Sequence, residues 1–334
     1  MGTQKVALVV GASRGIGQQI AIDLAKNGYA VVVAAKSTTD DKDKNTALFP
    51  PDPNSSGSTI NTVAREIQEA GGEATALPVD VRDPSSIETL VARTVETYGR
   101  LDALVYNAGA VWWASVEDTP LKRFRLMQQV NVEGLYAAVQ AALPHLKKGK
   151  DKQQGAGTGA SSSSARPYTV ASSGARRGMQ CLHRETADMT IMQGKVGMSV
   201  LTKGLAMDFE RQGLKNMSIT SLWPAVAIES AATQKLERTD PSTARDLRKA
   251  TIFSDAVLAV LRAPIATANG LLALDEDFLR SESGGHVTDF SRYALVPGTA
   301  PRRIMPKRLP DLTVEEQEDE GTRINSAAPG KAKL

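Results

Sequence analysis

A short aliphatic segment, a glycine-rich turn and a helical pattern follow one another directly near the start of the chain. Residues 5–10 are mostly aliphatic and β-branched, which favours a parallel strand covered on both faces. Gly11, Gly15 and Gly17 come next. Glycine permits a tight turn and a close approach of a pyrophosphate to the backbone, and a helix that begins here directs its free N–H groups at the phosphates. This stretch therefore predicts the phosphate turn of a dinucleotide site, rather than a purely structural turn.

Composition limits the class of protein. The 334 residues, 41% of them hydrophobic, suffice for one large α/β domain with a full core. The net charge is only +3 with the basic residues scattered, so nucleic acid is not an expected partner. A single cysteine, Cys181, excludes an intramolecular disulfide, and with three dispersed histidines no metal site is expected. Because no apolar run is long enough for a membrane span, we expect a soluble intracellular protein.

Strand-like and helix-like segments alternate along most of the chain. The expected strands after the first are 29–35, 74–79, 101–106, 217–223 and 270–274, and the expected helices after the first are 59–70, 85–98, 119–146, 194–212 and 254–261. This alternation predicts an α/β fold with a doubly wound parallel sheet of the Rossmann type. Residues that follow the strands then meet at the carboxyl edge of the sheet, where such folds bind their ligands.

The end of the second strand decides which dinucleotide is favoured. An NAD site usually places an acidic residue there, to accept hydrogen bonds from the ribose 2′-OH. This chain has Lys36, and Arg14 lies inside the glycine turn. Two cations would pair with a 2′-phosphate, so NADP is the expected cofactor and NAD the less favoured one. The alternative is that Lys36 is a solvated loop cation.

Polar and small residues also follow the third and fourth strands. Asp80 can accept a hydrogen bond from an adenine amino group, or cap the next helix, and the two roles are compatible. Asn107, Ala108 and Gly109 let the backbone pass under the adenine ribose, and Asn107 can tie the sheet to the next strand. Asn131 lies among apolar helical residues, where its amide is costly unless it is hydrogen-bonded.

These motifs, in this order, resemble the short-chain dehydrogenase/reductase family over about residues 5–150 and 194–308. The G-x-x-x-G-x-G spacing of the glycine turn carries the resemblance, together with VNVEG at 130–134 and a lysine at 195. Pro224-Ala225 stands where the family has Pro-Gly, and Ile228-Glu229-Ser230 matches the following I-x-[ST] element. The resemblance implies reversible hydride transfer between the cofactor and a carbonyl or hydroxyl substrate.

The resemblance also implies roles for single residues. Asn131 would kink its helix and hold a water beside the catalytic Lys195, which binds the nicotinamide ribose. The backbone of Ile228 and the hydroxyl of Ser230 would bind the carboxamide. The full set of expected cofactor contacts is Gly11, Ser13, Arg14, Gly15, Ile16, Gly17, Lys36, Asp80, Asn107, Ala108, Gly109, Lys195, Ile228 and Ser230.

One catalytic position departs from the family pattern. Family chemistry needs a tyrosine four residues before the lysine, where the ammonium lowers the pKa of the phenol so that it can exchange a proton with the substrate. Here Ile191 occupies that position, and Tyr168 is too far upstream to share the helix face. We therefore expect impaired catalysis by an NADP-dependent oxidoreductase. The alternative is a non-catalytic nucleotide-binding regulator or scaffold.

The segment 147–193 is aberrant by composition. It is rich in glycine and serine and has no aliphatic strand, although a doubly wound sheet needs its fifth strand there, so that region is expected to be disrupted or irregular. Serine codons read one nucleotide earlier encode aliphatic residues or phenylalanine, so our hypothesis is that residues 160–177 are out of frame and 178–193 are a retained intron. A genuinely divergent loop in a pseudoenzyme is the rival explanation. Sequencing the transcript across codons 150–195 separates the two.

The remaining expectations concern the domain limits and partners. Residues 1–295 are expected to form the dinucleotide domain, with an inserted polar loop at 37–57, and 296–334 a disordered tail. The ending Ala332-Lys333-Leu334 resembles a peroxisomal address read by an import receptor, which favours the peroxisome over the cytoplasm or mitochondrion. Family resemblance further implies a lipid or fatty-acyl substrate and pairing of copies through the helices that contain Asn131 and Lys195.

Overall fold

The structure is a computed structural model. It describes residues 4–38, 57–112, 114–148, 168–172, 189–230, 233 and 237–306, and for 168–172 and 189–193 it describes the backbone.

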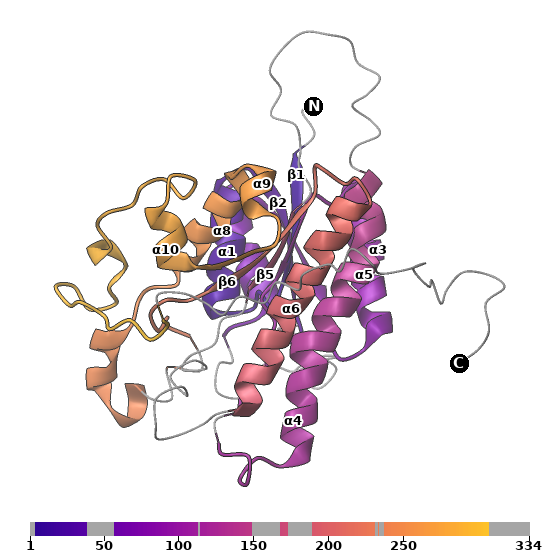
Figure 1. Ribbon diagram of the computed structural model, residues 1–334. Coiled ribbons are helices and arrows are strands. Elements are labelled where there is room, and N and C mark those ends of the chain that lie inside the picture. Colours follow the sequence, from indigo (N-terminus) through magenta and orange to yellow (C-terminus); the bar gives the residue numbers. More distant parts are fainter. Residues whose placement is uncertain are drawn as a thin grey trace, which may run out of the picture.

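Strands and helices alternate through the described chain (Figure 1). The strands are β1 (Lys5–Val10), β2 (Tyr29–Ala35), β3 (Glu73–Pro78), β4 (Ala103–Tyr106), β5 (Tyr168–Ser172), β6 (Ser218–Trp223) and β7 (Leu271–Leu274). The α-helices are α1 (Gly15–Lys26), α2 (Ile60–Glu69), α3 (Pro84–Tyr98), α4 (Leu121–Gln128), α5 (Gly134–Lys148), α6 (Met189–Arg211), α8 (Thr251–Arg262), α9 (Ile265–Ala268) and α10 (Asp275–Arg280). A π-helical turn, η1 (Gln129–Glu133), joins α4 to α5, and the 3₁₀ turns are η3 (Pro241–Asp246) and η4 (Ser291–Tyr293).

The strands form one sheet of seven, in the order β3-β2-β1-β4-β5-β6-β7, and every pair is parallel. The chain runs outward from β1 to β2 and β3, and then returns to place β4 on the other side of β1, so the switch point of this doubly wound sheet lies between β1 and β4. The predicted Rossmann-type fold is thus confirmed. All carboxyl ends of the strands lie at one edge of the sheet.

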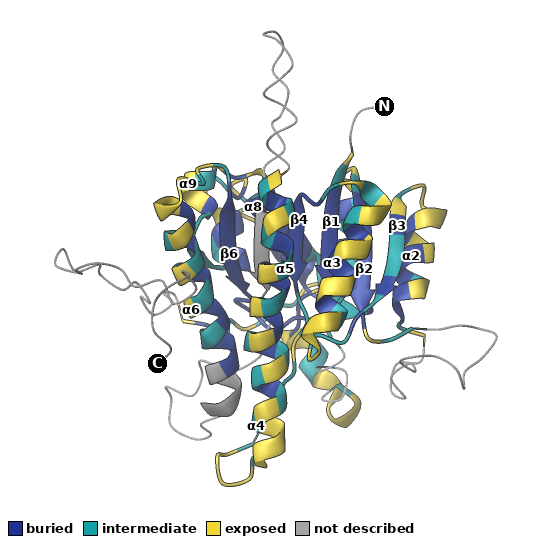
Figure 2. Ribbon diagram, turned by 90° about the vertical axis from the view of Figure 1, so that its right-hand side faces the viewer, coloured by how far each residue is buried: buried dark blue, intermediate teal, exposed yellow. Residues whose placement is uncertain are grey.

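Helices cover both faces of the sheet (Figure 1). Side chains of α1, α2 and α8 pack on one face, and side chains of α3, α5 and α6 pack on the other. Strands β1, β2 and β4 are almost wholly buried between these layers, as Figure 2 shows in dark blue. Aliphatic residues covered on two faces explain why these strands read as continuous apolar runs in the sequence.

The long helix expected at 119–146 is interrupted where Asn131 lies. Residues 129–133 form the π-helical turn, and Asn131 is fully buried within it. Its amide Oδ1 accepts from the Ala110 backbone N–H at 2.9 Å, and its Nδ2 donates to the Ala110 carbonyl at 3.1 Å. Both halves of the buried amide are therefore hydrogen-bonded, and the widened turn brings them to the segment after β4.

Two expectations about the chain's organisation need correction. Residues 168–172, expected to be loop, form β5 and pair with both β4 and β6, so backbone pairing on two sides makes a strand from a short, partly polar sequence. Residues 296–306, expected to begin a disordered tail, pack on the domain: the N–H of Ile304 donates to the Ala225 carbonyl and Met305 is buried. Residues 149–167, 173–188 and 307–334 and most of the inserted loop lie outside the described residues, as do the frame hypothesis and the peroxisomal address.

Candidate functional site

The glycine turn lies directly against the segment that follows β4. Gly11 has φ +87°, and a Cβ there would lie 2.5 Å from the Ala108 nitrogen. A Cβ on Gly17 would lie 2.1 Å from the Gly11 carbonyl oxygen, so neither position has room for a side chain. Asn107 ties the two segments together, since its Nδ2 donates to the Gly11 carbonyl at 3.2 Å. Asn107 therefore links the segment after β4 to the turn after β1, while a tie to the next strand stays a prediction.

The start of α1 suits a phosphate. Its first residue, Gly15, has φ +57°, and its N-cap residue, Arg14, is extended and makes no side-chain capping bond. The first turn holds no acidic residue, so no carboxylate of this turn competes for the N–H groups that a pyrophosphate would use. Ser13 is buried and Ile16 half-buried in the same turn. The residues present therefore fit the diphosphate of a dinucleotide.

Lys36, Asp80 and Arg82 form a charged group at the ends of β2 and β3. Lys36 Nζ lies 3.1 Å from Asp80 Oδ2, and Arg82 Nε donates to Asp80 Oδ1 at 2.9 Å. The Arg82 guanidinium, with a smaller contribution from Lys36, holds the pKa of the Asp80 carboxyl well below its usual range. Asp80 is therefore a paired anion, so an adenine amino group would have to share its carboxylate with two cations.

Lys195 is a buried cation at the centre of the site. Its side chain lies beside Gly109, because a Cβ on that glycine would lie 2.9 Å from Lys195 Nζ and 3.5 Å from Asn131 Oδ1. Burial lowers the pKa of Lys195 to about 8. Gly194 packs on Asn131 in turn, with its Cβ position 2.8 Å from Nδ2. The structure thus brings Lys195, Asn131 and the end of β4 together, while a water on Asn131 stays a prediction.

No phenol stands beside this lysine among the described side chains. Lys195 Nζ instead lies 4.0 Å from the sulfur of Met198. Ile191 lies one turn earlier in α6. Tyr168 begins β5, where it pairs with the first residues of β4 and β6, so its backbone is at the amino edge of the sheet and far from the site. The expectation that Tyr168 cannot replace the missing tyrosine agrees with this placement.

The segment after β6 forms the other wall of the site. Ile228 is buried there, and Ser230 lies against the glycine turn, with its Cα 3.7 Å from the Cβ position of Gly15. The Ser230 backbone N–H donates to Thr233 Oγ1 at 2.8 Å. Segments that carry most of the expected cofactor contacts therefore converge from β1, β4, α6 and β6.

A cluster of buried charges beside this wall was missed from the sequence. Asp275 and Glu276, at the start of α10, are buried, as is Arg248. Arg248 donates to Glu276 Oε2 at 2.8 Å. The available signal was the acidic run LDEDFL after the last strand. It did not identify the cluster, because acidic residues at a helix start are ordinary and do not reveal their long-range partners.

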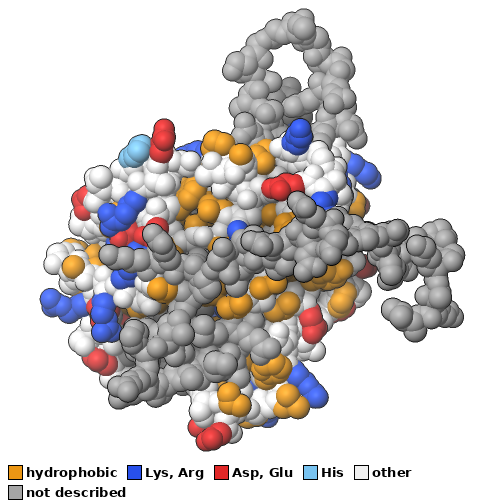
Figure 3. Space-filling model, viewed as in Figure 1, with side chains coloured by type: hydrophobic (Ala, Val, Ile, Leu, Met, Phe, Trp, Pro, Cys, Tyr) orange, Lys and Arg blue, Asp and Glu red, His pale blue; other side chains and the backbone are white. Residues whose placement is uncertain are grey.

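The described residues contain no helix long and apolar enough to cross a membrane, and no group of three His, Cys, Asp or Glu side chains that could hold a metal ion. On the face shown in Figure 3, basic and acidic side chains of the described residues are interspersed.

Comparison with known proteins agrees with this geometry. The short chain dehydrogenase family pattern matches residues 5–47 and 54–191, which is more than half of the chain. The chain therefore belongs to the short chain dehydrogenase family of oxidoreductases, whose members bind NAD(P).

Individual relatives share much of the chain. It is 33% identical to hydroxysteroid dehydrogenase-like protein 2 of Mus musculus over 93% of its own length and 54% of the mouse protein. The match to the Danio rerio protein of that name is 33% over 87% of this chain and 60% of the relative. The chain thus spans little more than half the length of these relatives. A crystal structure of a short chain dehydrogenase from Mycobacterium thermoresistibile has 35% identity and a TM-score of 0.70, with 88% of this chain and 92% of that chain covered.

Proposed function

We propose that the chain binds NADP(H) in preference to NAD(H) at the carboxyl edge of the sheet. The observation that carries this proposal is the glycine turn. Gly11 lies in close contact with Ala108, and α1 begins without a side-chain cap, which leaves its first backbone N–H groups for a diphosphate. Lys36 and Arg82 provide positive charge where β2 and β3 end, which favours a 2′-phosphate over a free hydroxyl. Comparing the affinities for NADPH and NADH tests the preference.

The proposed parent reaction is hydride transfer between this cofactor and a carbonyl or hydroxyl compound. The cofactor supplies or accepts the hydride at its nicotinamide ring. Lys195 would hold the nicotinamide ribose by its ammonium, and its burial favours the neutral amine at alkaline pH. Asn131 fixes the Ala110 backbone beside Lys195 through two hydrogen bonds, so it holds the segment after β4 in place.

We infer that turnover by this chain is weak, because Ile191 has no proton to exchange with the substrate. General acid or base catalysis contributes about 10²- to 10⁴-fold to a rate. Ile191→Tyr places a phenol one helical turn before Lys195, and we predict that it raises carbonyl reduction by about 100-fold or more. The assay follows NADPH oxidation with a panel of aldehydes and ketones.

The control for this gain is Ile191→Phe, which adds the ring without the hydroxyl and should leave turnover as it is. Robust turnover by the unaltered chain would contradict the inferred impairment. An equal gain in the Phe variant would show that the ring, and not proton transfer, is responsible.

The second candidate function is a nucleotide-binding regulator that uses the same site without chemistry. The glycine turn and the buried Lys195 can bind the dinucleotide without a proton donor. Ile191 removes the donor that catalysis needs, so the three together favour binding without chemistry. Saturable NADPH binding with no turnover, in the chain and in Ile191→Tyr alike, would support it.

For the catalytic function, a lipid or fatty-acyl carbonyl is our proposed substrate class, and the assay panel should include medium-chain and long-chain acyl ketones.

A further inference from the structure

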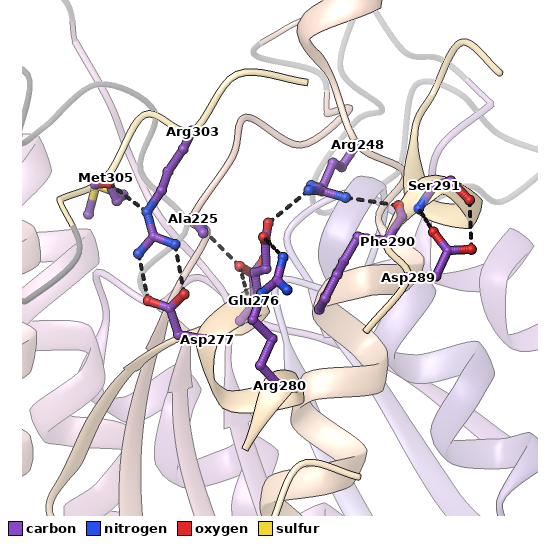
Figure 4. Close-up of polar contacts among 11 residues, drawn as sticks. Ala225, Arg248, Glu276, Asp277, Arg280, Asp289, Phe290, Ser291, Arg303 and Met305 are labelled. Atoms are coloured by element: carbon purple, nitrogen blue, oxygen red, sulfur yellow. Dashed lines mark hydrogen bonds and ion pairs between the residues drawn. The ribbon is translucent and has the colours of Figure 1, made fainter. Parts of the chain in front are cut away.

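Three consecutive carboxylates begin α10, and each holds a different part of the site wall. Asp275 Oδ1 accepts from the Ala225 backbone N–H at 2.8 Å and from the Glu276 N–H at 2.7 Å. Glu276 pairs with Arg248, and Asp277 accepts from Arg303 Nη1 at 2.7 Å. Figure 4 shows Glu276 between Arg248 and Arg280, and Arg303 facing Asp277.

Arg248 and Arg303 belong to segments that flank the site wall, residues 225–230, on its two sides. The Arg248 backbone N–H donates to the Ala227 carbonyl, and its own carbonyl accepts from the Glu229 N–H, each at 2.8 Å. Arg303 bridges Val226 in the antiparallel sense. The wall at 225–230 is thus framed by two short backbone pairings, and the frame is fixed to the start of α10 by its acids.

Ala225 is held on both of its backbone polar groups. Its N–H donates to Asp275, and its carbonyl accepts from the Ile304 N–H at 2.9 Å and the Met305 N–H at 3.2 Å. Ala225 is wholly buried and directly follows Pro224, where the chain leaves β6 for the cofactor site. The direction of the wall from this point is therefore set by the peptide orientation that Asp275 and the 304–305 segment impose.

Burying the Asp275 carboxylate costs the fold free energy. Asp275 is 1% exposed, and its Oδ2 has no hydrogen-bond partner among the described residues. Burial raises the pKa of Asp275 to about 7, against the two backbone N–H groups and Arg248, which lower it, and with Glu276, which raises it. A buried acid with an unused oxygen is an unfavourable way to satisfy two N–H groups, so its effect here lies in the orientation that it gives the Ala225 peptide.

We propose that Asp275 is a positioning residue that holds the 225–230 wall against the nicotinamide half of the dinucleotide, without touching the adenosine half. This inference rests on the proposed NADP(H) site. The adenosine half depends on the glycine turn after β1 and on Lys36 after β2, whereas Asp275 follows β7, the strand at the opposite end of the sheet from β3. Loss of Asp275 should therefore weaken one half of the cofactor's binding and spare the other.

The test compares two ligands on each variant. NADPH spans both halves, and adenosine 2′,5′-bisphosphate carries the adenosine half alone. For Asp275→Ala we expect NADPH affinity to fall by about 10-fold or more, with the affinity for the bisphosphate changing by less than about 2-fold. Asp275→Asn keeps an acceptor oxygen for both N–H groups and should bind both ligands much as the unaltered chain does at pH 6. If Asp275→Ala does not fold, Asp275→Ser makes the same comparison.

Asp102 offers a matched control. It is also a buried aspartate that accepts from a backbone N–H, that of Val6 at 2.8 Å, but it lies at the amino edge of the sheet. Asp102→Ala should destabilise the chain without changing the ratio of the two affinities. An unchanged ratio in Asp275→Ala, or in Asp275→Ser where that variant replaces it, would overturn the positioning role, and so would the same shift in Asp102→Ala. Failure of the unaltered chain to bind either ligand would instead remove the proposed function, and the inference with it.

Discussion

Lys36 is the residue on which the choice of cofactor depends. It is half-exposed and already paired with Asp80, so a 2′-phosphate has to replace or share that carboxylate. We predict that Lys36→Ala lowers the affinity for NADPH by about 10- to 100-fold, the range of a charge-assisted hydrogen bond, and leaves the affinity for NADH almost unchanged. Isothermal titration calorimetry with the two dinucleotides measures this.

Lys26 provides the control for this prediction. It is also a lysine with one close carboxylate, Asp23, but it lies in the last turn of α1, at the other end of the helix from the glycine turn. Lys26→Ala should leave both affinities as they are. Equal losses of NADPH and NADH affinity in Lys36→Ala would contradict a role for Lys36 in choosing between them.

Asp275 makes stability depend on pH in a defined direction. Burial raises its pKa to about 7 from 3.8, so the unfolded chain releases this proton more readily than the folded chain. Its contribution to stability is complete below about pH 4 and is lost as the pH rises through 7. We predict that the free energy of unfolding of the chain, relative to Asp275→Asn, falls between pH 5 and pH 8 by up to about 1.4 kcal/mol per pH unit. Urea unfolding across this range measures both; parallel profiles would rule out a raised pKa.

Some site residues could be found from the sequence and others could not. Lys36, Asp80 and Asn107 were identified because each follows a strand, and parallel strands bring their ends to one edge. The ion pair of Lys36 with Asp80 was not foreseen, since it depends on the register of β2 and β3. Asp275 was overlooked because its partner, Ala225, is 50 residues away and contributes only its backbone N–H.

At the scale of elements, the glycine turn is the most constrained joint in the fold. A Cβ on Gly17 would meet the Gly11 carbonyl at 2.1 Å and Asn107 Nδ2 at 2.7 Å, and the first of these is backbone that cannot move aside cheaply. We predict that Gly17→Ala destabilises the chain by about 1 to 3 kcal/mol or more and abolishes NADPH binding, because α1 must shift away from β1. Thermal unfolding and a binding titration measure the two effects.

The control is another helical glycine. Gly204 lies in α6, and a Cβ there meets no atom within 4 Å. Gly204→Ala should therefore stabilise the helix by about 0.5 to 1 kcal/mol and leave binding unchanged. If both variants behaved alike, the close contact at Gly17 would carry no weight.

Elements with continuous aliphatic or periodic patterns were predicted within a few residues, as β1 and β2 show. The resemblance implied a kink at Asn131, but not its form as a π-helical turn at 129–133, because that form depends on the Asn131 side chain reaching Ala110 across 21 residues. Strand β5 was missed for a related reason. Its sequence YTVAS is short and partly polar, and its strand conformation comes from the neighbours on both sides.

At the scale of the whole molecule, the sheet sets the geometry of the site and the segment that ends the described chain completes it. Residues 296–306 return to β6, where Met305 is buried and Arg303 pairs with Asp277. Composition suggested a tail because this stretch is rich in proline and charge. Its packing could not be foreseen, because its contacts are with the backbone of a distant loop. The backbone at Ala225 is therefore held by a segment about 80 residues further along the chain.

The central claim is that the glycine turn and the cations beside it bind the phosphorylated dinucleotide. The most direct measurement is calorimetric titration of the purified chain with NADPH and with NADH under identical conditions. We predict saturable binding of one NADPH per chain and weaker binding of NADH. Equal affinities, or no binding of either dinucleotide, would contradict it.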